Sequence, residues 1–560
     1  MTTLQPRGPY SQDELKKLYP EGLQLQLVQV LLRHGERSPV SARFQNAGLG
    51  AFWPYCAVAR RMVSSTMEAN GANWSPLQWR RRLETFGDDD GPAIASGPRG
   101  EVDAVCNLGE LTDKGRETTW NLGQRLRHLY VDQLHFMPPF INDADAIYLR
   151  ATPIPRALES LQQAFWGMYP SKTRSASFPP ITIVTRAPAD ETLFPNDSNC
   201  RRFAQLSRAF AQRTADRWNT TSEMDYLNKL ISNWMPESSK RVAVDSHPRL
   251  SGIMDTINST LAHGPETRLP KEFYDDKGRA IIDKIGVEEW FSGYQESREY
   301  RALGIGGLMG DVVTRMVGSV EHKGNGGSVE IGGNDGSLAD GKGGKPIKLA
   351  LSGCHDTTLA AVLTSLGAFQ GEAWPPYTSH IALELFRKGN VERAQAGDKQ
   401  KFEETSPVED IINPKVRKAW YGSIFGGTSE NGEWKETRPV GIARRRTEEL
   451  SEEEKSKLDG YFVRIRYNDK VMTVPGCKPA GKHLDGDEAF CTLASHLQIP
   501  VEESHVLIVH PRRRLRPSST NTLHQTGKLN VSATLERLRS PKSPSLQDIK
   551  GLLDGYDYRC

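Results

Sequence analysis

The chain has few cysteines, no zinc-binding pattern and no excess of charge. Seven cysteines in 560 residues are too few for a disulfide framework, and an odd number cannot pair completely. No CxxC or His/Cys cluster has the spacing of a structural zinc site, so we expect no metal and no other cofactor. Lys and Arg (72) nearly balance Asp and Glu (69), and this balance gives no indication of a nucleic-acid partner.

Long hydrophobic runs are also missing. The first apolar run, residues 23–32, is too short to cross a bilayer, and no later stretch does better, so we expect no transmembrane segment. Residues 1–22 form a polar segment without the apolar centre of a signal peptide or the acid-poor character of a mitochondrial presequence. We therefore expect an intracellular, cytoplasmic protein, while mitochondrial and secreted locations stay open. Nothing in the sequence indicates an oligomeric state.

Two cysteines near the end of the predicted core leave one pairing question open. Cys477 and Cys491 are spaced so that they could close a loop in an oxidising compartment. With an intracellular location expected, two reduced thiols are the favoured interpretation.

Strand and helix patterns alternate in much of the chain. Buried strands are predicted at residues 23–32, 145–152 and 347–353, and helical periodicity follows the second and third. This alternation is typical of an α/β fold, a three-layer sandwich with a mainly parallel central sheet. We assign residues 23–169 and 346–500 to this domain.

The remaining segments are predicted to be insertions or a tail. Residues 170–345 are mostly helical and are interpreted as an inserted cap domain that ends in a Gly-rich linker. A long polar insertion, residues 389–460, separates the two strands of a predicted hairpin, and Ser451 with Glu454 predicts a short capped helix there. Residues 501–560 are predicted to be a disordered basic tail.

Charged side chains lie at or just after the ends of the three strands. They are Arg33, His34, Glu36 and Arg37, then Arg150, then His355 and Asp356. Because the carboxyl ends of parallel strands open on one crevice, we expect these side chains to meet there. Burying so many positive groups is costly unless an anion neutralises them, and guanidinium groups match phosphate oxygens well. The sequence therefore predicts a phosphate site.

The two histidines suggest what happens to that phosphate. Neighbouring arginines lower the pKa of an imidazole, so one ring can stay neutral and attack phosphorus. Asp356, protonated beside a phosphate dianion, can donate a proton to the leaving alkoxide and later activate water. The arginines supply the charge neutralisation that a metal would otherwise provide.

The motif RHGxRxP after a buried strand resembles that of the histidine acid phosphatase family, the acid-phosphatase branch of the histidine phosphatases, which has a phosphoglycerate-mutase-like fold. LTDKGRETTWNLGQRLRHLY, YLRATPIPRALESLQQAFWGMYP and SGCHDTTLAAVLTSLGAF are similar to further family segments, from about Leu23 to Cys491. The resemblance implies an active acid phosphatase, a phosphoric monoester hydrolase with a phosphohistidine intermediate. It implies His34 as nucleophile, Asp356 as proton donor, and the phosphate ligands Arg33, Arg37, Arg150 and His355.

Three residues near these motifs need separate expectations. Arg156 shares the segment of the third arginine but belongs to the following helix, so we expect a mostly structural role. Glu36 adds a carboxylate inside the first motif and is expected to face Arg37. Cys354 replaces the small residue usual before His-Asp and is interpreted as a small hydrophobe, with a reactive thiol as the alternative.

Two other functions stay open at this point. A phosphoglycerate-mutase-type phosphatase or mutase also begins with Arg-His-Gly-Glu, but Arg37 and the adjacent Asp356 favour the acid-phosphatase branch. A non-catalytic phosphate-binding or scaffolding protein would not need an intact His34 and Asp356. The substrate is a small phosphate monoester, with lysophosphatidate favoured slightly over phytate, sugar phosphates and phosphoproteins.

Overall fold

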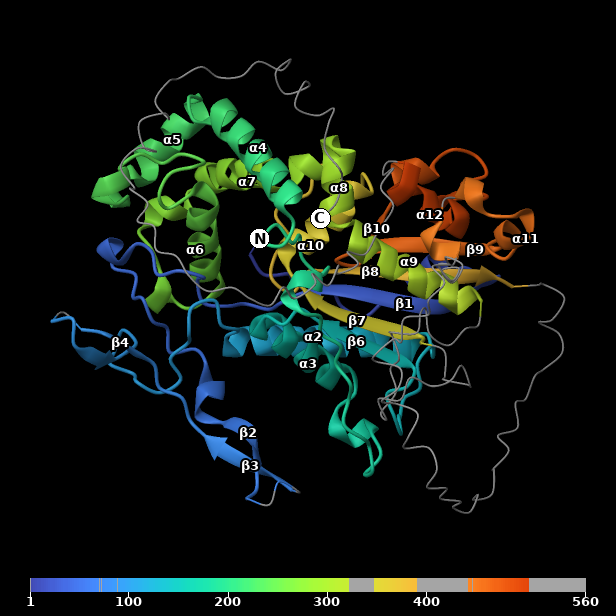
Figure 1. Cartoon of the computed structure of the whole chain (residues 1–560), viewed down its shortest axis with the longest axis horizontal. Coiled ribbons are helices and arrows are strands. Elements are labelled where there is room, and N and C mark those ends of the chain that lie inside the picture. The colour runs from blue at the N-terminus through green and yellow to red at the C-terminus, as the bar shows by residue number, and fades with distance from the viewer. Residues whose placement is uncertain are drawn as a thin grey trace, which may run out of the picture.

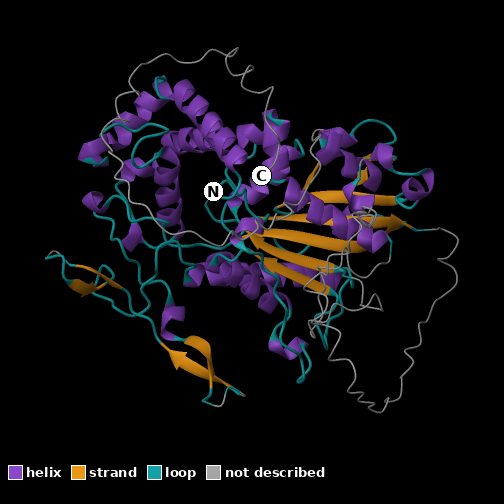
Figure 2. Cartoon of the chain, in the orientation of Figure 1, coloured by secondary structure: helices purple, strands orange, loops and turns teal. Residues whose placement is uncertain are grey.

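The computed structural model describes residues 2–321, 347–389 and 442–502, apart from residues 70, 72, 88 and 446. A central sheet has helices on both faces, and a group of helices lies beyond one end of it (Figure 1, Figure 2). The strands are β1 (Leu23–Arg33), β2 (Met62–Met67), β3 (Trp74–Trp79), β4 (Glu84–Phe86), β5 (Pro92–Ile94), β6 (Ile147–Ala151), β7 (Leu349–Cys354), β8 (His380–Lys388), β9 (Tyr461–Tyr467), β10 (Lys470–Met472), β11 (His483–Leu484) and β12 (Asp487–Thr492). The α-helices are α1 (Gln12–Leu18), α2 (Asp113–Arg127), α3 (Pro155–Met168), α4 (Arg201–Trp218), α5 (Ser222–Ile231), α6 (Leu250–Ala262), α7 (Asp276–Glu296), α8 (Arg298–Gly304), α9 (Gly306–Val320), α10 (Asp356–Ser365), α11 (Glu452–Ser456) and α12 (Leu493–Glu502).

The central sheet has eight strands and a parallel half that contains the three predicted strands. Its order is β11-β12-β9-β8-β1-β7-β6, and β10 pairs with β9. β7 lies between β1 and β6 and is parallel to both, whereas β8 and the strands beyond it are joined by antiparallel pairing. The layered α/β fold expected from the sequence is confirmed. Parallel pairing is found in the part of the sheet that carries the motifs.

The two faces of β1 are buried against different helices. Val28, Val30 and Leu32 pack with residues of α2 and α3 on one face. Leu27 and Leu31 point to the other face and pack with residues of α9 and α10. A strand that is apolar on both sides has to lie in the middle of a sandwich, and this explains its continuous hydrophobic run.

The segment interpreted as an inserted cap contains the helices α4 to α9, but α9 does not pack with the others in a separate core. Residues of α5, α6 and α7 form a separate core, which Phe44 and Trp53 from the first part of the chain complete. Helix α9 instead lies on the sheet, where the Gln29 side chain donates to the Val312 carbonyl at 2.9 Å and accepts from Arg315 at 2.8 Å. The prediction that the cap includes α9 is therefore wrong, because its many apolar side chains cover β1.

Two disulfides are present in the described part of the chain. Cys477 and Cys491 are bonded (S–S 2.07 Å), so the favoured interpretation as reduced thiols is wrong; the fold brings their Cα atoms within 5.4 Å. The sequence did not predict the second disulfide, which joins Cys56 and Cys106 across 50 residues.

Several predicted segments lie wholly or partly outside the described residues. They are the Gly-rich linker, most of the 389–460 insertion and almost all of the 501–560 tail. Inside the insertion, the short helix predicted after Ser451 is confirmed as α11, with the expected capping box between Ser451 and Glu454. No helix among the described residues has both the length and the apolar character needed to cross a membrane.

A buried ion-pair network ties the antiparallel half of the sheet to its neighbours. Glu384 of β8 is fully buried and accepts from the Arg464 guanidinium at 2.6 Å. The same carboxylate accepts from the hydroxyls of Tyr19 and Tyr130 at 2.6 and 2.8 Å. Burial would raise the pKa of Glu384, but Arg464 and Arg466 outweigh it, so that the pKa lies below its ordinary value.

We predict that Glu384→Gln lowers the free energy of unfolding by about 3–5 kcal/mol, because it leaves buried arginines without their carboxylate. Urea unfolding measures this loss. Since the folded pKa is depressed, the contribution of Glu384 is present at neutral pH and is lost as the pH falls through that folded pKa. The control is Glu372→Gln at the exposed pair with Lys470, where a loss below about 1 kcal/mol is expected. Equal losses in the two variants would contradict the prediction.

Candidate active site

The register of two parallel strands brings the two predicted histidines together. Arg33, the last residue of β1, lies opposite Cys354, the last residue of β7. His34 and His355 therefore leave the sheet side by side, and their ring centroids are 5.5 Å apart. His355 is the N-cap of α10, which begins at Asp356. The sheet thus places both motifs at the carboxyl ends of its parallel strands, which form one edge of the sheet, as predicted.

Close backbone packing fixes the chain after His34. A Cβ on Gly35 would lie 2.3 Å from the Gly115 carbonyl oxygen, so α2 approaches the loop too closely for any other residue. The Ser160 hydroxyl accepts from the Gly35 N–H at 3.1 Å. Glu36 does not face Arg37 as predicted: its carboxylate accepts from the Thr118 hydroxyl at 2.5 Å. The prediction for Glu36 is wrong because the close contact with α2 turns this side chain toward that helix.

Arg33 and Asp356 form an ion pair at this edge. The Arg33 guanidinium lies 2.6 Å from the Asp356 carboxylate and 4.2 Å from the centroid of the Tyr377 ring. The Trp374 indole N–H donates to the same carboxylate at 3.0 Å. Burial would raise the pKa of Asp356, but Arg33 and the Trp374 hydrogen bond outweigh it, and the pKa is lowered.

Arg37 connects this edge to the cap. Its guanidinium pairs with Asp255 of α6 at 2.7 Å, and Asp255 also lies 3.5 Å from Arg43. Burial would lower the pKa of Arg37, yet Asp255 raises it, so this side chain stays positively charged.

The third predicted phosphate ligand, Arg150, is placed elsewhere. It lies opposite Ser352 within the sheet, two residues before Thr152 at the edge of β6. Its fully buried guanidinium pairs with Glu191 at 2.6 Å and Asp311 at 3.0 Å. The placement predicted for Arg150 is therefore wrong: its side chain is enclosed with Glu191 and Asp311 and is not at the end of the strand.

Arg156, for which we expected a structural role, lies near the histidines instead. It belongs to the first turn of α3, beside the end of β6. Within the described chain it forms no ion pair with a carboxylate, and its Nε has no hydrogen-bond partner. Burial, followed by the charge of Arg37, lowers the pKa of Arg156 to about 10. A half-buried, unpaired cation next to another cation is typical of an anion site. The signal in the sequence was its position just past the end of a strand.

Both histidines are kept neutral. Burial is the main cause that lowers the pKa of His34, and the charges of Arg156 and Arg33 add to it. Burial and Arg156 also lower the pKa of His355, although Asp356 opposes them. The His34 Nδ1 lies 2.9 Å from the Gly35 carbonyl oxygen. A carbonyl only accepts, so Nδ1 carries the proton and the lone pair is on Nε2.

The edge opens into a cavity of about 1140 Å³ that the cap partly encloses. Arg33, Arg37 and Asp356 line it. Aromatic and apolar side chains line much of the remaining wall, namely Phe44, Trp234, Met235, Met254, Trp290 and Trp374. Cys354 is buried in the adjoining core and burial raises the pKa of its thiol, which supports its interpretation as a small hydrophobe.

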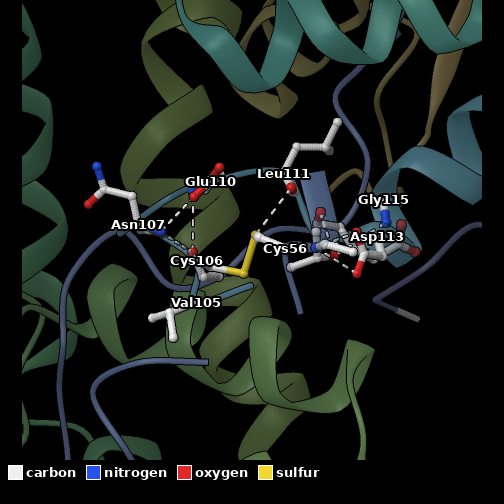
Figure 3. Close-up of a disulfide and its surroundings, with 12 residues drawn as sticks. Cys56, Val105, Cys106, Asn107, Glu110, Leu111, Asp113 and Gly115 are labelled. Atoms are coloured by element: carbon white, nitrogen blue, oxygen red, sulfur yellow. Dashed lines mark hydrogen bonds between the residues drawn. A yellow bond between two sulfur atoms is a disulfide. The ribbon is translucent and has the colours of Figure 1, made fainter. Parts of the chain in front are cut away.

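A disulfide supports the loop that follows His34. Cys106 is bonded to Cys56 (Figure 3), and backbone hydrogen bonds join the segment after it, residues 107–112, to residues 36–39. Ser38 donates its N–H to the Glu110 carbonyl at 3.0 Å, and Thr112 donates to Glu36 at 3.0 Å. The disulfide therefore fixes the start of the segment to which the Arg37 loop is hydrogen-bonded.

We predict that replacing Arg156 weakens phosphate binding, whereas replacing Arg150 lowers stability. Arg156→Ala should raise the inhibition constant of inorganic phosphate by about 10- to 100-fold, because a charged donor is lost, with little change in stability. Arg150→Ala should lower the free energy of unfolding by about 3–5 kcal/mol, because it leaves Glu191 without its buried partner. Inhibition kinetics and urea unfolding on both variants measure these effects. Weakened phosphate binding by Arg150→Ala at unchanged stability would contradict the assignment.

The disulfide between Cys56 and Cys106 leads to a second prediction. Removing it with the double replacement Cys56→Ser, Cys106→Ser should raise the inhibition constant of phosphate several-fold, because the loop with Arg37 loses its support. The matched control is Cys477→Ser, Cys491→Ser, which removes a disulfide away from the site. This disulfide contributes about 3 kcal/mol to the free energy of unfolding, similar to the contribution of the first one. The free energy of unfolding should be lower in both variants. Phosphate inhibition that is equal in the two variants would show that the disulfide supports stability alone.

Comparison with known proteins identifies the family of this chain. The model of the histidine phosphatase superfamily (branch 2) matches residues 24–405. A probable acid phosphatase of Schizosaccharomyces pombe is 35% identical over 479 residues, which cover 85% of this chain and 91% of the relative. Human lysophosphatidic acid phosphatase type 6 is 24% identical over 65% of this chain and 74% of its own length. A multiple inositol polyphosphate phosphatase of Bifidobacterium longum superimposes with a TM-score of 0.46 at 12% identity, over 90% of this chain and 98% of that structure. The chain belongs to the histidine phosphatase superfamily, branch 2, and is a histidine acid phosphatase.

Proposed function

We propose that His34 is the nucleophile and Asp356 the proton donor of the acid-phosphatase reaction in this chain. The observation that carries the proposal is the pair of neutral imidazoles surrounded by Arg33, Arg37 and Arg156 at one edge of the sheet. These three guanidinium groups hold the phosphoryl oxygens of the substrate, and His355 adds a further contact. Arg156 thereby takes the role that the sequence gave to Arg150.

In the first half of the reaction the phosphoryl group moves to His34. The lone pair on Nε2 attacks phosphorus, and the bond between phosphorus and the ester oxygen breaks. The leaving oxygen takes its proton from the Asp356 carboxyl group. The arginines stabilise the charge that develops on the phosphoryl oxygens.

In the second half water removes the phosphoryl group from the histidine. The Asp356 carboxylate accepts a proton from the water, and the water oxygen attacks phosphorus while the bond to Nε2 breaks. Inorganic phosphate leaves, and Asp356 is again protonated. His34 regains its neutral ring because burial and the nearby arginines keep its pKa low.

The charge state of Asp356 links this mechanism to pH. Without substrate, Arg33 keeps the pKa of Asp356 below its ordinary value, and the carboxyl group is ionised. A bound phosphate dianion neutralises Arg33 and places negative charge beside Asp356, and both changes raise the pKa. Since the acid form is required, turnover falls as the pH rises through the raised pKa, and the optimum is acidic.

We infer that the substrate is a phosphate monoester with an apolar group, such as a lysophosphatidate. The cavity beside the phosphate site is large enough for more than a phosphate, and Trp234, Trp290 and Trp374 line it. A relative of this chain is named for lysophosphatidic acid. Phytate is the second candidate because the cavity also includes Arg43 and Arg249. The mutase alternative is not favoured, since the matching family model is that of branch 2 and the two relatives described above are named as phosphatases.

The location of the protein stays a prediction. A cytoplasmic protein was expected, but the disulfides Cys56–Cys106 and Cys477–Cys491 are more typical of an oxidising compartment. We therefore propose that the chain folds where disulfides form.

We predict that Asp356→Asn lowers turnover of alkyl phosphates by about 10²- to 10⁴-fold, the range of general acid catalysis. Hydrolysis of p-nitrophenyl phosphate should fall much less, because p-nitrophenolate leaves without a proton. Steady-state kinetics with lysophosphatidate, phytate, glycerol phosphate and p-nitrophenyl phosphate measure both effects and rank the substrates.

His34→Ala is the control and should abolish hydrolysis of every substrate. The pH dependence of the wild type tests the same assignment, and an optimum above neutrality would contradict it. Equal losses on alkyl and nitrophenyl substrates would remove Asp356 from the role of proton donor. Faster turnover of phytate than of lysophosphatidate would reverse the inferred substrate preference.

A further inference from the structure

An arm of the chain projects from the body of the protein. Residues 57–105 contain β2, β3, β4 and β5, which form two hairpins outside the central sheet, and β2 and β3 stand well away from it (Figure 1, Figure 2). The disulfide between Cys56 and Cys106 closes the base of this arm. Nothing in the phosphatase mechanism uses the arm.

The arm holds an unusual share of the exposed apolar surface. The large hydrophobic side chains that are exposed number thirteen in the described chain, and seven of them lie here. They are Val63, Met67, Trp74, Leu77, Trp79, Phe86 and Ile94. Clusters of exposed apolar side chains on a soluble surface mark a contact site.

Both faces of the β2–β3 hairpin are apolar. Met67 pairs with Trp74, and these side chains share one face, 60% and 62% exposed. Leu77 and Trp79 point to the opposite face, where they are 51% and 40% exposed. A flat protein surface would cover one face and leave the other in water. An environment that surrounds the hairpin covers both.

The base of the hairpin is strongly basic. Residues 60–82 contain five arginines and a single carboxylate, Glu68, and Arg81 and Arg82 pair with Glu110 and Asp103 from outside this range. Arg60, Arg61 and Arg80 are exposed and form no ion pair within the described residues. Glu68 lies near the other end, where it accepts from the Ser75 hydroxyl at 2.6 Å. The hairpin therefore has exposed apolar side chains at one end and arginines without ion pairs at the other. This arrangement complements a surface in which an apolar layer lies under anionic groups.

We propose that the β2–β3 hairpin docks on an anionic lipid surface. Trp74, Met67 and Leu77 enter the interfacial layer, and the arginines meet the lipid phosphates. A two-stranded ribbon has unpaired backbone groups at its edges, which hydrocarbon does not tolerate, so the insertion is shallow and stays at the level of the headgroups. Aromatic side chains are favoured at that depth.

A second copy of this chain is a less suitable partner for the hairpin than an anionic lipid surface. Strand addition needs a free edge with regular N–H donors, and at the β3 edge Pro76 has none. Packing face to face would leave either the Trp74 face or the Trp79 face exposed. The arginines at the base would also repel the same arginines of a second copy related by twofold symmetry.

The test is co-sedimentation of the full chain with vesicles. Vesicles of phosphatidylcholine with one third phosphatidylglycerol should bind the protein, pure phosphatidylcholine vesicles should bind it weakly, and salt should reduce binding. Replacing Trp74 and Leu77 with Ser should lower the partition coefficient by about tenfold or more, since two apolar side chains lose their interface. Replacing Arg60, Arg61 and Arg80 with Gln should remove the preference for phosphatidylglycerol.

The matched control replaces Trp166 and Phe140 with Ser. These side chains are 48% and 50% exposed but lie outside the arm, so partitioning should not change. Hydrolysis of p-nitrophenyl phosphate in solution verifies that each variant is folded. A chain that binds vesicles but does not hydrolyse this substrate would contradict the proposed function and not the docking.

Three results would overturn the proposal. The full chain fails to bind anionic vesicles, or the control loses binding as much as the hairpin variant. The third is a concentration-dependent dimer in analytical ultracentrifugation that disappears when Trp74 and Leu77 are replaced, which would assign the hairpin to a second copy.

Discussion

Buried positive charge at one edge of the sheet is the constraint on which the rest of this structure depends. An arginine does not give up its proton, so Arg33, Arg37 and Arg156 have to be balanced by something else. Asp356 and Asp255 balance the first two. Arg156 has no such partner in the described chain, and in the proposed mechanism a phosphate group supplies the missing charge.

The same charges decide how the neighbouring groups titrate. An imidazole buried among guanidinium groups cannot hold a proton at neutral pH, and His34 therefore presents a lone pair. Arg33 also keeps the pKa of Asp356 below its ordinary value while the two side chains are paired. In the proposed mechanism, one electrostatic field therefore prepares both the nucleophile and the acid, and bound phosphate raises the pKa of Asp356.

The surrounding fold keeps these groups in place from several directions. Close contact between Gly35 and Gly115 fixes the loop against α2, and the disulfide of Cys56 and Cys106 supports its neighbouring segment. The cap contributes Asp255, so Arg37, a proposed phosphate ligand, also joins the two parts of the chain. The cavity that we propose as the site of the leaving group is lined by residues from both parts.

The sequence by itself determined the strands, the layered fold and the motif positions His34, His355 and Asp356. It could do so because an apolar run followed directly by polar residues marks where a buried strand ends, and such local patterns need no knowledge of the partner strand. Register places the residues just after β1 and β7 together whatever the rest of the chain does.

Only the tertiary structure decided which side chains turn toward that edge. Arg150 and Arg156 are separated by one short turn, but the first is enclosed with Glu191 and Asp311 while the second reaches the histidines. The pairing of Cys477 with Cys491 depended in the same way on which distant segments lie opposite each other. A sequence pattern fixes the type and spacing of residues, whereas the direction of a side chain depends on partners that are far away along the chain.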